Sequence, residues 1–351
     1  MNKKKLEKFI FIPGELNQWK KYKNKNFIIW LAGINLKDKL KKIDPYLNDE
    51  IDKIDKNKLI SILGNQFGIL ILHDNWVFTA SDFTRSYPIY WKLNKTKIFL
   101  SPQARLIKKS TDKINHDQLQ AYRMSGYTTN DQTLWKNIYN LKSGTYLIFT
   151  KKFDLSLKQY FTYQPWKIKK KRINIYKNIL KQEINKLFLS IIKEAKGRRI
   201  IVPLSAGLDS RLIISGLKKY NYKNVKCFSY GLKNNFETIA AKKIAQKLGY
   251  KWKFVEIKYK EARVFYTSAK FNKYIRLTND GVNVPSIHSL YAIDFLLKSK
   301  FITRNDIVIN GNSGDFISGG HIPKNIKYLK NPSNKLQFLF DRIFDIHFKK
   351  H

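Results

Sequence analysis

The segment Ile200-Ile-Val-Pro-Leu-Ser-Ala-Gly-Leu-Asp-Ser-Arg211 decides the fold of the second half of this chain. Its first five residues form a short apolar run with the length of a buried parallel strand, and apolar residues return after Arg211 with helical spacing. Between the two lie small residues, among them Ser205 and Gly207. Small side chains let backbone N–H groups approach an anion at a helix N-terminus, where the helix dipole also favours negative charge. The segment therefore predicts a phosphate-binding loop between a strand and a helix.

Two polar residues, Asp209 and Ser210, stand at the start of the predicted helix. A hydroxyl there can hold a phosphate oxygen, whereas a carboxylate is useful chiefly if it holds Mg²⁺ against the phosphates. The segment is neither a Walker A loop, since Gly-Lys-[Ser/Thr] is absent, nor a dinucleotide fingerprint, since the glycines are wrongly spaced. The alternative is an ordinary strand-to-helix turn with a Ser or Asp cap.

The next residues repeat the alternation of strand and helix. We expect strands at Val225–Gly231 and Phe254–Ile257, with a helix at Glu237–Leu248 between them. Such βαβ units give a parallel sheet, whose ligands bind at the carboxyl ends of the strands. Leu204 and Tyr230 lie at such ends.

A fourth short strand, Asp306–Asn310, leads into the glycine-rich segment Gly311–His321. Four glycines surround one carboxylate, Asp315, so the backbone can come close to a ligand. The alternative is a flexible surface loop.

These motifs resemble a known family. Ser-x-Gly-x-Asp-Ser resembles the pyrophosphate loop of the N-type ATP pyrophosphatases, and the form Pro-Leu-Ser-Ala-Gly-Leu-Asp-Ser-Arg looks most like the asparagine synthetases. The glycine-rich segment resembles the second signature of that family, Gly-Glu-Gly-Ser-Asp-Glu followed by Gly-Gly. Asn312 and Phe316 stand where the family carries glutamates, so ATP and Mg²⁺ can bind without the full reaction following.

The resemblance implies a set of site residues, with ATP and Mg²⁺ as cofactors. The expected nucleotide-binding residues are Leu204, Ser205, Gly207, Asp209, Ser210, Tyr230, Gly231 and Gly311. The expected metal ligands are Asp209 and Asp315. For Tyr230 and Gly231 the alternative is a tight turn that ends a strand, and no catalytic residue is assigned.

The front half is rich in β-structure signals. Gln66–Leu72 and Trp76–Ala80 are predicted strands, and the residues between them give a hairpin signal. Further β-rich segments and a short helix follow at Asp82–Trp91, Ile98–Arg105, Asp117–Met124 and Leu141–Ile148. This order is similar to the class II glutamine amidotransferase domain that precedes the synthetase domain in the resembled family.

The resemblance implies two domains. Residues 1–165 are expected to form an α+β, four-layer αββα sandwich of the Ntn-hydrolase type, a degenerate amidotransferase domain. Residues 173–351 are expected to form an α/β parallel-sheet ATP pyrophosphatase domain like the adenine nucleotide alpha hydrolases. A charged linker, Trp166–Arg172, joins them. An amphipathic helix should follow the linker, with an apolar face of Ile175, Ile179, Ile184, Leu187, Phe188 and Ile191.

Glutamine hydrolysis is not expected. A class II glutaminase uses an N-terminal cysteine whose own α-amine activates the thiol. This sequence begins Met1-Asn2-Lys3. Its single cysteine, Cys227, lies in a predicted buried strand, where we expect it to be a small apolar residue of the core. An amine would then arrive as free ammonia or as part of the acceptor.

Composition sets outer limits. A chain of 351 residues has room for two domains, and 43% hydrophobic residues exclude disorder as its main state. One cysteine excludes a disulfide framework and suits a reducing cytoplasm. Apolar stretches such as Phe27–Ile34 are too short to span a bilayer, and no signal-peptide core follows the first lysines. A cytoplasmic protein without a transmembrane segment is expected.

The formal charge of +42 raises the question of anionic partners. Lysine and arginine favour binding to nucleic acid regardless of its sequence. The charge is spread along the whole chain, however, so a solvated basic surface is the favoured interpretation. Contact with an anionic membrane or glycolipid and contact with nucleic acid stay as alternatives. The six histidines show no metal-ligand spacing.

The resulting hypothesis is an asparagine synthetase-like amide ligase that adenylates a carboxylate, either aspartate or a sugar-linked acid, for example in surface polysaccharide biosynthesis. In the resembled family the synthetase domain continues past the glycine-rich loop, so a missing C-terminal segment or a partner polypeptide is expected. A non-catalytic nucleotide-binding remnant or partner protein is the alternative. A tRNA-modifying pyrophosphatase is a third, which the front domain and the absence of a cysteine cluster oppose.

Overall fold

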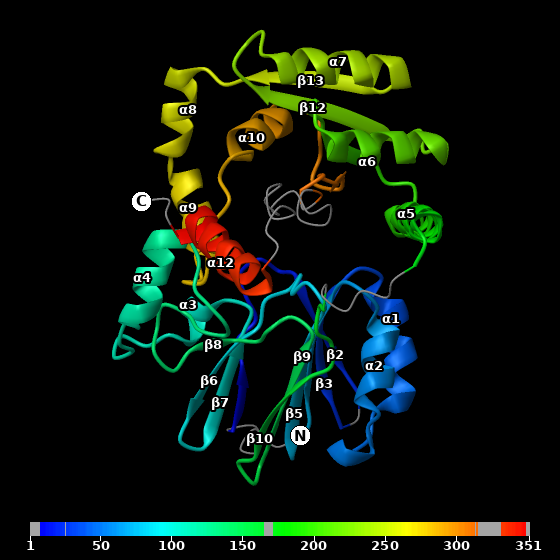
Figure 1. Cartoon of the computed structure of the whole chain (residues 1–351). Coiled ribbons are helices and arrows are strands. Elements are labelled where there is room, and N and C mark those ends of the chain that lie inside the picture. The colour runs from blue at the N-terminus through cyan, green and yellow to red at the C-terminus, as the bar shows by residue number, and fades with distance from the viewer. Residues whose placement is uncertain (1–7, 25, 165–170, 313, 315–330, 349–351) are drawn as a thin grey trace. The chain divides into compact units, whose positions relative to one another are not determined.

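The computed structural model describes residues 8–24, 26–164, 171–312, 314 and 331–348. The chain forms two compact units. The N-terminal unit contains the residues up to 167, together with 275–285 and the residues from 343 onward; the C-terminal unit contains 168–274 and 286–342. The division falls within the predicted linker, but neither the assignment of 275–285 to the N-terminal unit nor that of the residues from 343 onward was predicted. Figure 1 labels the elements of both units.

The N-terminal unit is built on two sheets. The larger has the order β10-β9-β5-β4-β3-β2, with every neighbouring pair antiparallel. Its strands are β2 (Trp19–Lys23), β3 (Ile28–Gly33), β4 (Phe67–Leu72), β5 (Trp76–Ser81), β9 (Thr145–Thr150) and β10 (Leu155–Gln159). The smaller has the order β1-β7-β6-β8, in which β1 runs parallel to β7. Its strands are β1 (Phe9–Phe11), β6 (Tyr90–Asn94), β7 (Lys97–Ser101) and β8 (Tyr139–Asn140).

The two sheets pack face to face. One apolar core lies between them and includes Leu70 from the larger sheet and Ile98 from the smaller. A second core lies on the outer face of the larger sheet, where α1 (Leu36–Ile43) and α2 (Lys56–Leu63) cover it (Figure 1). Because β4 and β5 are covered on both faces, every residue of these two strands is buried. Two short 3₁₀ helices, η2 (Asp44–Tyr46) and η3 (Ile51–Lys53), join α1 to α2.

The predicted hairpin is confirmed, since β4 and β5 pair in register and His73 N–H donates to the carbonyl of Trp76. The turn after β5 is fixed by Asp82, which is fully buried. Its carboxylate accepts the backbone N–H groups of Phe67 and Thr84 at 2.9 and 2.8 Å. Beyond the smaller sheet lie the short α3 (Ala104–Ile107) and α4 (His116–Ser125). The complete four-layer αββα arrangement stays a prediction.

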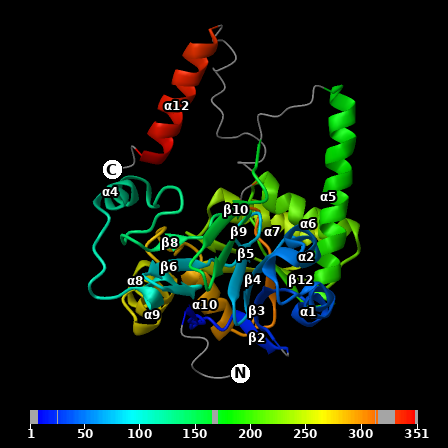
Figure 2. The same cartoon turned by 90° about the horizontal axis from the view of Figure 1, so that it is seen from below.

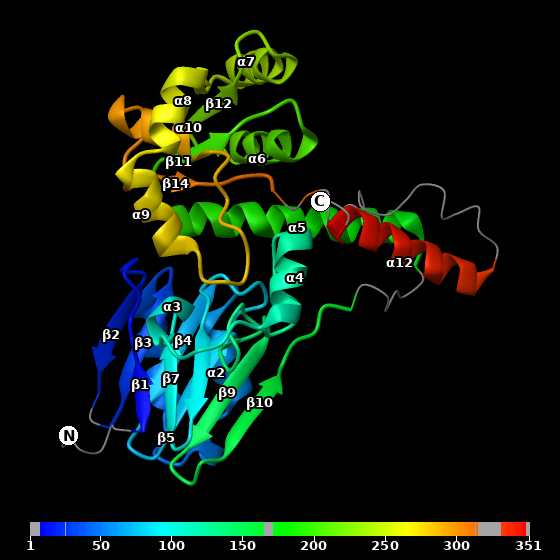
Figure 3. The ribbon, with the colours of Figure 1, turned by 90° about the vertical axis from the view of Figure 1, so that its left-hand side faces the viewer.

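Residues 275–285 belong to the N-terminal unit although they come late in the chain. Thr128 N–H donates to Val282 O at 2.7 Å, and Leu134 N–H donates to Gly281 O at 2.8 Å. The Val282 side chain is buried in a small core with Tyr90 and with Ala104 and Ile107 of α3. Figure 3 shows this segment beside α3 and α4.

The C-terminal unit is built on one parallel sheet with the order β13-β12-β11-β14. Its strands are β11 (Ile200–Pro203), β12 (Val225–Gly231), β13 (Lys251–Glu256) and β14 (Ile307–Val308). Helices α5 (Ile173–Ala195), α6 (Leu208–Lys219) and α7 (Phe236–Leu248) pack on one face. Helices α8 (Tyr259–Tyr266) and α10 (Leu290–Lys298) pack on the other. The α/β parallel sheet is as the sequence predicted, and the helices on both of its faces make it a doubly wound sheet.

Two further helices, α9 (Ala269–Thr278) and α12 (Pro332–Phe348), complete the described elements. None of the helices in the described ranges combines the length and hydropathy that a bilayer span requires. The predicted apolar face of α5 is only partly correct. Phe188 is buried, and Ile184 and Ile191 pack against the core, but Ile175, Ile179 and Leu187 are exposed. Only the C-terminal half of α5 reaches the sheet.

Candidate nucleotide-binding site

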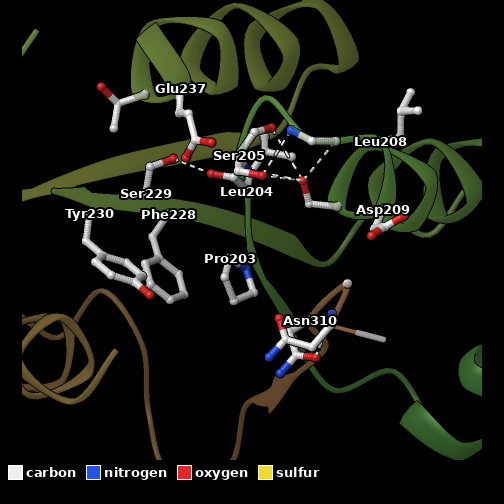
Figure 4. A pocket seen from close by; sticks show the side chains of 15 residues that line it. Pro203, Leu204, Ser205, Leu208, Asp209, Phe228, Ser229, Tyr230, Glu237 and Asn310 are labelled. Atoms are coloured by element: carbon white, nitrogen blue, oxygen red, sulfur yellow. Dashed lines mark hydrogen bonds between the residues drawn. The ribbon is translucent and has the colours of Figure 1, made fainter. Parts of the chain in front are cut away.

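A cavity of about 640 Å³ lies at the carboxyl ends of β11, β12 and β14 (Figure 4). Strand order reverses there, because β12 and β13 follow β11 on one side while the chain returns to β14 on the other. Open α/β sheets bind ligands at such reversal points. The lining residues are Pro203, Leu204, Ser205, Gly207, Leu208, Asp209, Ser210, Phe228, Ser229, Tyr230, Glu237, Thr238, Asn310, Gly311 and Asn312.

Two serines close the loop between β11 and α6. Ser205 N–H donates to Ser210 Oγ at 3.2 Å, and the two hydroxyl oxygens lie 3.2 Å apart. Ser205 Oγ also accepts the N–H of Gly207 at 3.1 Å. These bonds join the start of the loop to the first turn of α6, so the serine hydroxyls and the intervening backbone form one wall of the cavity (Figure 4).

The N-terminus of α6 opens into this wall. Gly207 is its N-cap residue and, being a glycine, supplies no side-chain cap. A Cβ atom on Gly207 would lie 3.2 Å from Ser205 Oγ, so the glycine is favoured by the close approach of the serine rather than by its φ of −66°. Asp209 stands in the first turn of α6. The backbone N–H groups of that turn and its dipole suit an anion.

Gly311 and Gly314, the first two glycines of the glycine-rich segment, lie directly against Asp209. A Cβ atom on Gly311 would come within 2.8 Å of the Asp209 main chain, and one on Gly314 would overlap the Asp209 carboxylate. Both glycines are therefore required by close packing, and Gly311 also lines the cavity. Asp315, the second predicted metal ligand, lies outside the described residues, as does Phe316.

Two aromatic residues at the end of β12 line another side of the cavity. Phe228 and Tyr230 stack with ring centroids 6.2 Å apart, and burial raises the pKa of Tyr230. Both line the cavity, whereas Gly231, predicted beside them, does not. Gly231 has a φ of +142° and its carbonyl accepts the N–H of Ile257, which fits the turn alternative. Its role in nucleotide binding stays a prediction.

The main chain of Leu204 is already engaged within the protein. Its N–H donates to Phe228 O at 2.8 Å, and its carbonyl accepts the hydroxyl of Ser229 at 2.6 Å. Trp252 Nε1 in turn donates to Ser229 Oγ at 3.0 Å. A nucleotide at Leu204 would therefore meet its side chain or the remaining lone pair of its carbonyl.

Sequence reasoning missed several lining residues, among them Ser229 and Glu237. Glu237 stands in the first turn of α7, and Figure 4 shows its side chain directed toward the serine loop. The rule that selected Tyr230 could have found both, because the strand ends and the helix begins at this edge of the sheet. Among the described lining residues, two are carboxylates and none is lysine or arginine.

Cys227 lies in the core of the C-terminal unit, as predicted. Its side chain is fully buried, and burial raises the pKa of the thiol to about 12. No group of three or more His, Cys, Asp or Glu side chains suited to a metal ion occurs in the part of the chain that the structure describes.

Part of the C-terminal unit is similar to a known protein family. A family model described as asparagine synthase matches residues 196–339. The provisionally named asparagine synthetase [glutamine-hydrolyzing] 2 of Methanocaldococcus jannaschii is 23% identical over 254 residues, which cover 70% of this chain and 47% of that protein. The chain thus spans about half the length of this relative.

Solved structures give more distant likenesses. The NH3-dependent NAD synthetase from Campylobacter jejuni has 16% sequence identity and a TM-score of 0.25, over 39% of this chain and 58% of that one. The U34-tRNA thiolase NcsA from Methanococcus maripaludis has the same identity and TM-score, over 50% and 67%. These likenesses are too distant to bear on the fold. The family match and the archaeal relative support a relationship of residues 196–339 to the asparagine synthase family.

Proposed function

We propose that the C-terminal unit binds ATP with Mg²⁺ and that the protein is an ATP-dependent amide ligase without glutaminase activity. The observation that carries the proposal is the N-terminus of α6, where the N-cap residue Gly207 supplies no side-chain cap and where Ser205 and Ser210 line a cavity at the reversal point of the sheet. A cavity of about 640 Å³ is of the size that holds a nucleotide-sized ligand.

The residues present fit the parts of the nucleotide. The serine hydroxyls and the first N–H groups of α6 would hold phosphate oxygens. Tyr230, which stacks on the fully buried ring of Phe228, offers aromatic surface to the base. The Asp209 carboxylate is an oxygen ligand of the kind that Mg²⁺ takes, placed beside that phosphate position. Mg²⁺, when bound, would neutralise charge on the pyrophosphate.

The reaction proposed has two steps. A carboxylate oxygen of the acceptor attacks the α-phosphorus, the bond to the pyrophosphate oxygen breaks, and an acyl-adenylate and pyrophosphate result. The nitrogen of an amine then attacks the acyl carbon, loses a proton and displaces AMP, which leaves an amide. The α6 N–H groups stabilise charge on the leaving pyrophosphate. The acceptor is aspartate or a sugar-linked acid, and the amine is ammonia or part of an acceptor.

A second candidate is a nucleotide-binding protein that does not complete the reaction. Two observations favour it. Asn312 stands where the resembled family has a glutamate, and the described lining of the cavity offers no cationic side chain to the developing charge.

Calorimetry with the full chain tests binding first. Asp209→Asn is expected to weaken Mg·ATP binding by about tenfold or more, the worth of a charge-assisted contact. The matched control is Asp117→Asn, which changes an exposed aspartate in the first turn of α4. Equal affinities for the two variants would remove Asp209 from the site, and no binding of the parent at millimolar ATP would refute both candidates.

Isotope exchange between pyrophosphate and ATP then separates the candidates. Exchange that depends on an added carboxylate supports the ligase. Tight Mg·ATP binding without exchange for aspartate or sugar acids supports the second candidate.

A further inference from the structure

The N-terminal half of α5 is not packed against the sheet. Every residue from 171 to 183 is exposed, so about three turns of the helix present all their sides to solvent. Figures 2 and 3 show this half extending beyond α6. A soluble helix normally buries its apolar stripe. Here the exposed apolar side chains along α5 are Ile173, Ile175, Tyr176, Ile179, Leu180, Leu187 and Leu189.

A groove between α5 and α6 continues this apolar surface. It has a volume of about 380 Å³, and its apolar floor includes Leu180, Phe188 and Leu212. Gly216 of α6 makes the groove, because the ring of Phe188 occupies the space that a Cβ atom at this position would need. The two helices therefore pack closely at Phe188.

Lysines border the groove. Lys177 and Lys181 of α5 and Lys219 of α6 line it together with its apolar floor. The helix also carries Lys186 and Lys193, against two glutamates, one of which pairs with Lys186 at 2.7 Å. Lys171 and Arg172, both exposed, precede the helix. An apolar strip bordered by ammonium groups is complementary to a partner surface that has negative charge on its outside and apolar groups beneath that charge.

We propose that this α5–α6 surface, formed by the exposed apolar residues of α5, the groove and its lysines, binds the anionic surface of a lipid bilayer. Leu180 and Leu187, 59% and 52% exposed, would enter the boundary between headgroups and acyl chains. The side chains of Lys177 and Lys181 would extend along this apolar surface and place their ammonium groups at the lipid phosphates. Lys219 Nζ donates to Asn185 Oδ1 at 2.9 Å and would exchange this exposed hydrogen bond for a lipid phosphate. A second copy of the chain is the less suitable occupant, because each copy carries a formal charge of +42.

Flotation of the full chain with vesicles tests the proposal. Vesicles of phosphatidylcholine mixed with phosphatidylglycerol should carry the protein, and vesicles of phosphatidylcholine alone should not. The triple variant Lys177→Gln/Lys181→Gln/Lys219→Gln should lose roughly 100-fold in affinity, about fivefold for each lysine near the surface. The double variant Leu180→Gln/Leu187→Gln should also float poorly.

The matched control replaces three exposed lysines of α7, in Lys242→Gln/Lys243→Gln/Lys247→Gln. Equal losses in the α7 and α5–α6 triple variants would overturn the proposal, since they would show attraction by overall charge. Equal flotation with both kinds of vesicle, or with neither, would also overturn it. Self-association of the parent that the double leucine variant abolishes would assign the surface to a second copy instead. Unchanged thermal unfolding of each variant shows that the fold is intact.

Discussion

Replacement of Ser210 by alanine tests the serine loop most directly. The hydroxyl is buried and lies within 3.2 to 3.4 Å of four groups: Ser205 N, Ser205 Oγ, Ser205 O and Gly207 O. It can donate one hydrogen bond and accept from the Ser205 N–H. Ser210→Ala removes both and leaves that N–H without its acceptor.

The expected cost follows from these distances. Bonds of this length lie at the weak end of the range, so the two together contribute about 1–2 kcal/mol. The higher helix propensity of alanine offsets about 0.5 kcal/mol of this loss in the free energy of unfolding. Ser215→Ala, at an exposed position of the same helix, should show only that gain. The difference between the two variants therefore measures the hydroxyl.

Hydrogen exchange, followed by mass spectrometry on peptides from β11 and the first turn of α6, measures the local opening free energy. Ser210→Ala should exchange about 5 to 30 times faster there than Ser215→Ala, with the N-terminal unit unchanged. If the two variants exchange at the same rate, the hydroxyl does not hold the loop and the argument for a preformed phosphate site fails.

Four further outcomes are expected. Burial raises the pKa of Asp280 from 3.8 to about 6, so the native state binds this proton more tightly and the free energy of unfolding decreases as pH rises between those values. The difference in the free energy of unfolding between Asp280→Asn and the parent should therefore shift in favour of the variant by about 1–3 kcal/mol from about pH 4 to about pH 8. Urea titration at both pH values measures it, and a difference that does not change with pH contradicts the prediction. Gly216→Val places side-chain atoms in the ring of Phe188 and should cost about 2 kcal/mol or more, whereas Ser215→Val should cost less than about 1 kcal/mol. The buried Cys227 thiol should not react with thiol reagents in the native protein. The 351-residue chain should release no ammonia from glutamine, and ammonia release that a mutation in the N-terminal unit abolishes would refute this last prediction.

The central strands could be read from the sequence because burial on both faces leaves a short apolar run. Such runs predicted β11 and β12 correctly and placed β13 close to its true position. The same signal failed for β2, whose residues Trp19–Lys23 include three exposed lysines. This strand is at the edge of its sheet, where charged side chains are tolerated because one side faces solvent.

Features that depend on distant contacts were not predictable. Helix α5 has apolar residues along its whole length, and nothing local distinguishes the half that packs from the half that does not. Among the residues that line the cavity, those of the loop from Ser205 to Ser210 could be selected from the sequence because one local motif contains them; their role in nucleotide binding stays a prediction. Ser229 and Glu237 were missed because each is unremarkable within its own element and gains meaning only from the neighbouring strand.

The placement of residues 275–285 in the N-terminal unit limits how this protein can be divided or recombined. A break between residues 167 and 168 would separate Val282 from the apolar residues around it. The amides of Thr128 and Leu134 would lose their acceptors at the same time, since both donate to carbonyls of that segment. Neither fragment would be self-contained. A recombination that exchanged one half for that of another protein would succeed only if it also preserved this segment, so the two halves are expected to be inherited together.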